Sequence, residues 1–136
     1  MLEYSHMKLT ANALNIVCND LNEKLIYNHI SNISMINSHD FLLTFSMYRK
    51  GKLLISLNHQ KPFLSLIENV TPTPTIAGSL NDNLRKLVKD GNVTNIKAIN
   101  NDRIVSIEFT KVNDYYEKVK RELIIELIPH RQNLIV

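Results

Sequence analysis

The chain has 136 residues but only one cysteine, three glycines and no tryptophan. Because Cys18 is alone, no internal disulfide can form, which is typical of proteins in a reducing cytoplasm. The glycines lie far apart, so no glycine-rich loop could cradle a nucleotide phosphate. No apolar run approaches the ~20 residues that cross a bilayer, and the start lacks a signal-peptide pattern. We therefore expect a cytoplasmic protein with no membrane contact and no cofactor.

Metal-binding and nucleophilic side chains are also sparse. The five histidines show none of the spacings typical of metal ligands, so we expect no metal site; they are His6, His29, His39, His59 and His130. Cys18 borders the apolar stripe of a predicted helix. This position favours a buried thiol over a catalytic nucleophile.

Length and composition indicate one globular domain. Hydrophobic residues make up 44% of the chain and charged residues 21%, which is typical of a protein with a packed core. The net charge of +3 permits binding to a polyanion but does not identify a partner. Residues 1–7 have the look of a tag or disordered start, because "SHM" precedes Lys8. We expect the domain itself at residues 8–136, cut from a longer multidomain protein, since the chain stops on an apolar run.

Apolar periodicity predicts two helices. The first spans about residues 10–25, and the second follows a proline-rich loop at residues 69–78. Ser79 and Asp82 have the spacing of a capping box, and Gly91 is placed to end the second helix. The residues predicted to line its buried face are Leu80, Leu84, Leu87 and Val88, whereas Arg85, Lys86 and Lys89 fall on the other side.

Alternating apolar residues predict about seven strands, at residues 29–36, 40–49, 52–57, 63–67, 94–99, 103–109 and 121–128. Gly51 could take a positive φ in a tight turn between the second and third of them. The first four strands suggest an antiparallel meander. Helices and strands in this order predict an α+β fold.

Three polar segments could contact nucleic acid, and each also has a plain structural explanation. Residues 111–122 interleave two tyrosines with basic residues, which suits base stacking and phosphate pairing or merely a solvated hairpin. Lysines in residues 47–52 could touch a phosphate backbone, but they are also common at solvated turns. Asp102 and Arg103 follow two asparagines and precede a strand, a pattern that alone favours a turn.

Several segments, in order, resemble the N-terminal domain of the NFACT family, also named fibronectin-binding protein A, over nearly the whole chain. They are "LNEKL" in the first helix, the "PTP" loop, "LRK" in the second helix, Gly91, "NDRI" and "IELIPHRQNLIV". Two departures stand out: the family's Phe-Asp-Gly becomes residues 9–11, Leu-Thr-Ala, and its Met-Gly-Arg becomes residues 128–130, Ile-Pro-His. Contacts made by the family at those two places are therefore not carried over.

The resemblance implies an antiparallel β-sandwich with flanking helices, similar to the N-terminal domain of formamidopyrimidine-DNA glycosylases. In the family an Asp-Arg pair is implicated in transfer RNA recognition, which maps onto Asp102 and Arg103. Arg85 and Lys86 would add phosphate contacts. The implied function is a non-enzymatic RNA-binding domain of a ribosome quality control factor. It would help to recruit alanyl transfer RNA to obstructed large ribosomal subunits with stalled peptidyl transfer RNA, for C-terminal alanine tailing.

Two rival functions remain open from the sequence. The family's older name suggests a surface adhesin that binds fibronectin or fibrinogen. The glycosylase resemblance suggests a nucleic-acid lyase, but such enzymes attack with the secondary amine of an N-terminal proline. Neither Met1 nor Met7 supplies that group, so we expect no catalytic residues and no enzymatic activity.

Overall fold

A computed structural model describes residues 10–49, 51–68, 78–100 and 102–136. Within them it contains two helices and eight strands, which confirms the α+β class. The elements are α1 (Ala11–Leu25), β1 (Ile30–Met35), β2 (Asp40–Phe45), β3 (Gly51–Ser56), β4 (Phe63–Glu68), α2 (Ser79–Val88), β5 (Asn92–Ala98), β6 (Ile104–Val112), β7 (Lys118–Glu126) and β8 (Asn133–Ile135). The predicted tag and nearly all of the proline-rich loop lie outside the described residues. No helix of the described part is long and apolar enough to span a membrane.

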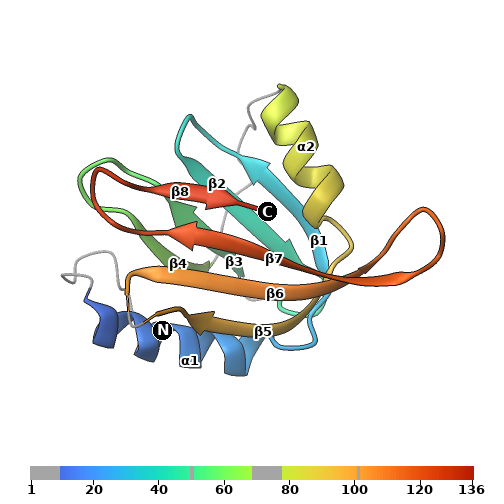
Figure 1. The fold of residues 1–136 in the computed structure, drawn as a ribbon, viewed down its shortest axis with the longest axis horizontal. Coiled ribbons are helices and arrows are strands. Elements are labelled where there is room, and N and C mark those ends of the chain that lie inside the picture. The colour runs from blue at the N-terminus through green and yellow to red at the C-terminus, as the bar shows by residue number, and fades with distance from the viewer. Residues whose placement is uncertain (1–9, 50, 69–77, 101) are drawn as a thin grey trace.

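The strands form two antiparallel sheets, each a meander in sequence order. One sheet has the order β1-β2-β3-β4, as predicted, and the other has the order β5-β6-β7-β8. The sheets lie one over the other, with α1 running along β5 and α2 packed near β1 (Figure 1). Their inner faces and both helices contribute to one apolar core. Strand β8 was not predicted, because three residues are too few to show an alternating pattern.

Helix α1 agrees closely with its prediction. Thr10 is the N-cap, and its hydroxyl accepts a hydrogen bond from the Ala13 amide at 3.0 Å. The buried stripe consists of Leu14, Val17, Cys18, Leu21 and Leu25. Burial raises the pKa of the Cys18 thiol to about 12. The prediction of a buried thiol is therefore confirmed.

Helix α2 corrects two predictions. No side chain caps its N-terminus, because the N-cap is Gly78 rather than Ser79, so the predicted capping box is wrong. Leu80 is 56% exposed and does not join the core, whereas Leu84 and Val88 are buried as predicted. The helix instead buries Asn81, whose Oδ1 accepts a hydrogen bond from the amide of Met35 at 3.1 Å. This bond ties the first turn of α2 to the end of β1.

Two glycines have roles that differ from those predicted. Gly51 is the first residue of β3 and is paired with Glu68 of β4. A Cβ there would lie 2.0 Å from the carbonyl oxygen of Ile67, so glycine is needed for close strand approach. Gly91 is not the helix cap either, because Asp90 takes the left-handed conformation at φ 73°. The missing side chain of Gly91 makes room for the ring of Phe109.

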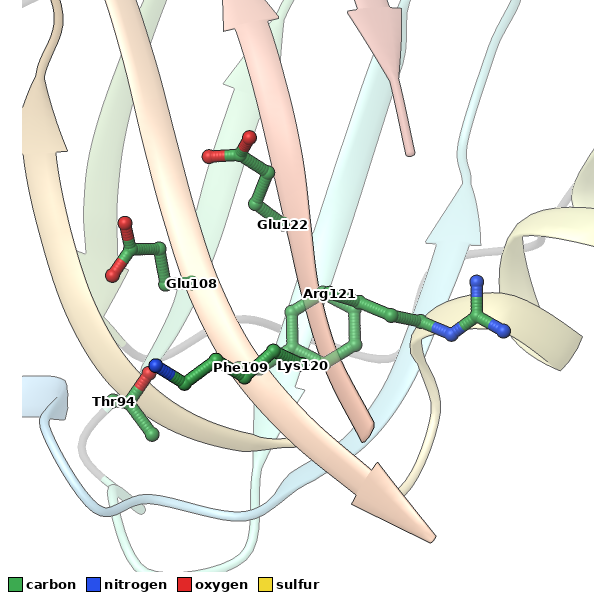
Figure 2. A pocket seen from close by; sticks show the side chains of 6 residues that line it. All are labelled: Thr94, Glu108, Phe109, Lys120, Arg121 and Glu122. Carbon is green, nitrogen blue, oxygen red and sulfur yellow. The ribbon is translucent and has the colours of Figure 1, made fainter. Parts of the chain in front are cut away.

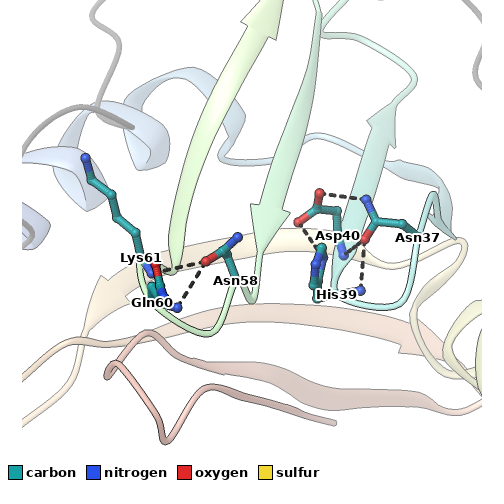
Figure 3. A network of polar contacts seen from close by, with 6 residues as sticks. All are labelled: Asn37, His39, Asp40, Asn58, Gln60 and Lys61. Atoms are coloured by element: carbon teal, nitrogen blue, oxygen red, sulfur yellow. Dashed lines mark hydrogen bonds and ion pairs between the residues drawn. The ribbon is translucent and has the colours of Figure 1, made fainter.

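Asparagine side chains stabilise the turns that connect β1 with β2 and β3 with β4. Asn37 Oδ1 accepts hydrogen bonds from the amides of His39 and Asp40, at 2.9 and 2.8 Å (Figure 3). Asn58 Oδ1 accepts from the amides of Gln60 and Lys61, at 3.0 and 3.3 Å. Such bonds satisfy amides that have no strand partner, which explains the abundance of asparagine between strands.

Candidate nucleic-acid interface

Asp102 and Arg103 lie in the turn that connects β5 with β6. The Ile99 amide donates to the Ile104 carbonyl at 2.8 Å, and the Asp102 amide donates back to the Ile99 carbonyl at 3.1 Å. Asn100 has a left-handed φ of 55°, which asparagine tolerates better than most residues. The chain therefore turns where the asparagine-rich pattern predicted it would turn.

The turn fixes the backbone of this pair and leaves polar atoms at the surface. The Asp102 Oδ1 atom accepts a hydrogen bond from the Arg103 amide at 2.7 Å. The carbonyl of Arg103 accepts from the amide of buried Leu127 at 2.8 Å, so its backbone is held by the sheet. Within the described residues the Arg103 guanidinium has no hydrogen bond or ion pair. Arg103 is half-buried, and the N–H donors of its guanidinium are left without a partner in this part of the chain.

Arg85 and Lys86 are exposed on α2, as predicted, but they belong to a different surface. The Lys111 ammonium, from the far end of β6, donates a hydrogen bond to the carbonyl of Lys86. Lys86, Lys111 and Arg121 line one shallow depression with Asp114. We call Lys86, Lys111 and Arg121 the basic cluster.

Electrostatics within the basic cluster are mixed. Partial burial lowers the pKa of the Lys111 ammonium, and the carboxylate of Asp90 opposes this effect. Arg121 lowers the Lys111 pKa further, whereas Asp114 raises it. An added anion beside Lys111 and Arg121 would relieve the repulsion between their charges. The three cations of the cluster are thus accompanied by two carboxylates, those of Asp90 and Asp114.

The structure does not bring the four predicted site residues together. Arg103 directly precedes β6, whereas Lys111 is near the other end of that strand. Seven residues separate Ile104 from Lys111, which corresponds to about 23 Å in an extended strand. The turn at Asp102 and Arg103 and the basic cluster are therefore two separate surfaces.

The outer face between β6 and β7 is less suitable for an anion. Glu108 and Glu122 lie opposite each other in the strand register and line a pocket with Lys120 (Figure 2). Glu108 pairs with Lys97 at 3.0 Å, and the Ser106 hydroxyl donates to Glu122 at 2.5 Å. Figure 2 shows that Arg121 extends away from the two glutamates, toward α2.

Sequence reasoning also missed a histidine pair. His130 Nδ1 and His59 Nε2 are hydrogen-bonded at 2.7 Å, and Gln132 Nε2 lies 3.3 Å from His59 Nδ1. Because 71 residues separate the two histidines, no local pattern could have indicated their contact. Across the described residues, no three histidine, cysteine or acidic side chains gather to hold a metal ion.

Fold and surface together define a class: a small α+β domain of two antiparallel meanders, with a polar turn before β6 and a basic cluster near the other end of that strand. The chain belongs to the NFACT family, because residues 11–136 match the family described as "NFACT N-terminal and middle domains". This result confirms the resemblance inferred from the sequence. No curated protein sequence matches the chain significantly.

Solved structures of similar fold include proteins from three bacteria. The N-terminal domain of fibronectin-binding protein PavA from Streptococcus pneumoniae has a TM-score of 0.83 at 22% identity, over 92% of this chain and 48% of that chain. The N-terminal part of the fibronectin/fibrinogen-binding protein from Streptococcus suis has a TM-score of 0.85 at 20% identity, over 93% of this chain and 48% of that chain. The fibrinogen-binding protein from Staphylococcus aureus has a TM-score of 0.77 at 21% identity, over 92% of this chain and 44% of that chain. The chain thus spans about half the length of these structures.

Proposed function

We propose that this chain is the non-enzymatic, cytoplasmic RNA-binding domain of a ribosome quality control factor. It would help to recruit alanyl transfer RNA to obstructed large ribosomal subunits, where stalled peptides receive C-terminal alanine tails. The observation that carries the proposal is a surface turn in a domain of the NFACT family, in which Asp102 is exposed and Arg103 is half-buried. The chemistry of peptide transfer would stay with the ribosome.

The proposed contacts follow from the geometry of the two surfaces. Arg103 presents a planar, permanently charged fork that suits a phosphate or the edge of a base. One oxygen of Asp102 is used by the Arg103 amide, and the other could accept from a base or a ribose hydroxyl. Arg85 and Lys86 would bind phosphates elsewhere on the same transfer RNA, since their surface is separate.

The test uses the full-length protein with both turn residues replaced, Asp102→Ala and Arg103→Ala. The melting temperature should barely change, because few buried contacts are lost. Affinity for alanyl transfer RNA at fixed salt should fall by about 1 to 3 kcal/mol for each lost charged contact. Large-subunit co-sedimentation should largely survive, because other domains contribute to it.

A matched control is available on α1. Asp20 and Lys24 form an exposed ion pair at 3.1 Å, and replacing both by alanine also leaves the net charge unchanged. This control should retain transfer RNA affinity. Unfolding of the turn variant would indicate a structural role, and unchanged affinity would indicate a mere turn. Either outcome contradicts the proposal.

A second candidate function is adhesion to host matrix proteins. It is favoured by the names of the three similar proteins, which describe binding to fibronectin or fibrinogen. Saturable binding of the full-length protein to immobilised fibronectin, together with no affinity for transfer RNA, would support this alternative.

Similarity to the N-terminal domain of formamidopyrimidine-DNA glycosylases stays a prediction. Without an N-terminal proline, we expect no iminium intermediate and therefore no strand nicking on abasic DNA. Trapping of a covalent DNA adduct with borohydride would contradict this expectation.

A further inference from the structure

The hairpin of β6 and β7 extends past the rest of its sheet. The pairing of β5 with β6 stops at Asn92 and Thr110, whereas β6 and β7 remain paired as far as Val112 and Lys118. Figure 1 shows this hairpin projecting well beyond the body of the domain. Its tip, residues 113–117, can therefore enter a space that the sheet surface cannot reach.

The backbone of the tip is fixed by Asn113. The Asn113 Oδ1 atom accepts hydrogen bonds from the amides of Tyr115 and Glu117, both at 2.9 Å. The Asn113 amide donates to the Glu117 carbonyl at 2.9 Å, and the Asn113 carbonyl accepts from the Tyr116 amide at 3.0 Å. Tyr116 is held at a φ of 62°, a conformation that is unfavourable for a bulky residue. The tip is thus ordered at a local energetic cost.

This ordered tip displays two neighbouring aromatic side chains to solvent. Tyr115 is 81% exposed and Tyr116 is 91% exposed. Neither hydroxyl has a hydrogen-bond partner within the described residues. The core does not need these rings, and exposed aromatic faces on a rigid backbone provide stacking surfaces at little entropic cost.

Charge around the tip points to RNA as the ligand. From Lys111 to Arg121 the hairpin has four basic residues and two acidic ones, a balance of +4 − 2 = +2. The basic residues lie on the two arms, at Lys111, Lys118, Lys120 and Arg121, and the acidic residues Asp114 and Glu117 flank the tyrosines. Carboxylates at the tip would repel a phosphate, whereas cations on the arms would attract one. The pattern suits a base at the tip and phosphates along the arms.

We infer that Tyr115 and Tyr116 stack on unpaired bases of an RNA loop while the arm lysines and the basic cluster contact its flanking phosphates. This inference rests on the proposed function in assuming that RNA is the partner. It adds a second contact site, at the opposite end of β6 from Asp102 and Arg103. Aromatic stacking recognises unpaired bases of any sequence, so this site would favour single strands over duplexes.

The experiment measures fluorescence anisotropy of labelled RNA with the 136-residue chain. The probes are a 12-nucleotide single strand of mixed sequence and the same sequence as a duplex. The chain should bind the single strand more tightly, and Tyr115→Ala with Tyr116→Ala should weaken that binding by about tenfold or more. The chain has five tyrosines and no tryptophan, so the part of the tyrosine quenching that is lost in the alanine variant reports stacking at the tip.

Two variants serve as controls. Tyr115→Phe with Tyr116→Phe keeps both rings and should bind within about twofold of the parent, since stacking does not need the hydroxyl. Tyr27 is 74% exposed and also has a positive φ, of 65°, but lies outside the hairpin. Tyr27→Ala should therefore leave RNA affinity unchanged.

Four results would overturn the inference. The first is that the parent does not bind the single strand, and the second is that the alanine variant keeps the parent's affinity for it. The third is that the alanine variant loses as much affinity for the duplex as for the single strand. The fourth is that the alanine variant loses binding to immobilised fibronectin and keeps binding to RNA. The proposed function is tested separately on the same probes and on alanyl transfer RNA with Asp102→Ala and Arg103→Ala. If only the tyrosine variant loses affinity, the RNA contact at Asp102 and Arg103 is wrong and the contact at the hairpin is supported. If only the turn variant loses affinity, the contact at the hairpin is wrong and the contact at the turn is supported.

Discussion

Replacing Gly91 by alanine separates two explanations for this glycine. If it served as a helix cap, alanine would be unfavourable because of the backbone conformation. In the structure, however, its φ is not positive, and a Cβ would lie 2.4 Å from Cδ2 of Phe109. Phe109 is 1% exposed, so its ring has little room to move. We therefore expect destabilisation by a steric clash in the core.

The size of the effect follows from opposing contributions. Overpacking a close-packed core costs about 1 to 3 kcal/mol, whereas glycine to alanine stabilises by about 0.4 to 1 kcal/mol through the unfolded chain. The backbone cannot easily shift, because Gly91 accepts from the Ile30 amide at 2.7 Å and donates to the Val88 carbonyl at 3.1 Å. The free energy of unfolding in urea should thus fall by about 1 to 2 kcal/mol.

A double-mutant cycle with Phe109→Val tests the cause. Valine removes the ring atoms that the new methyl group would strike, and it suits a strand. In that background Gly91→Ala should be neutral or stabilising, since the methyl group would fill part of the cavity. The expected coupling is at least about 1 kcal/mol. Equal destabilisation in both backgrounds would refute the steric explanation and restore the role of Gly91 in ending the helix.

Two further predictions concern the helices. Leu84→Ala should lower the free energy of unfolding by about 2 to 5 kcal/mol, because Leu84 is buried; Leu80→Ala, a matched change at an exposed leucine, should cost under about 0.5 kcal/mol. The Cys18 thiol has its pKa raised to about 12 from an ordinary 9.0, so it should resist alkylation in the folded protein. Its contribution to stability is complete below about pH 9 and should be lost as the pH rises toward about 12. Rapid alkylation of native Cys18 at pH 8, or equal loss in Leu84→Ala and Leu80→Ala, would contradict these assignments.

Much of the fold could be predicted because apolar periodicity is a local signal. Leucine and valine recur at helical spacing in α1, and alternate positions of β6 are apolar, so both elements were recognised. The errors in α2 have a nonlocal cause. Asn81 is buried because it bonds to the end of β1, and this turns Leu80 toward solvent. No pattern within ten helical residues contains that information.

The roles predicted for Gly51 and Gly91 were wrong for a related reason. A glycine in a sequence first suggests a turn or a cap, since those explanations need only neighbouring residues. Gly51 and Gly91 are instead required by Ile67 and Phe109, which lie 16 and 18 residues further along the chain. The left-handed position after α2 is taken by Asp90. Both glycines are therefore needed for close packing against residues distant in sequence, whereas local reasoning had assigned them to a turn and a helix end.

The candidate RNA surfaces show the same division between local and distant information. Two asparagines before Asp102 were enough to predict a turn, and the structure has one there. The contact between Lys86 and Lys111 could not be foreseen, because it joins α2 to the end of β6 across 25 residues. That contact places the basic cluster at the base of the projecting hairpin. An RNA that reached both Arg103 and Lys111 would have to follow most of the length of β6, and this favours a large folded RNA over a short single strand as the ligand of the whole domain.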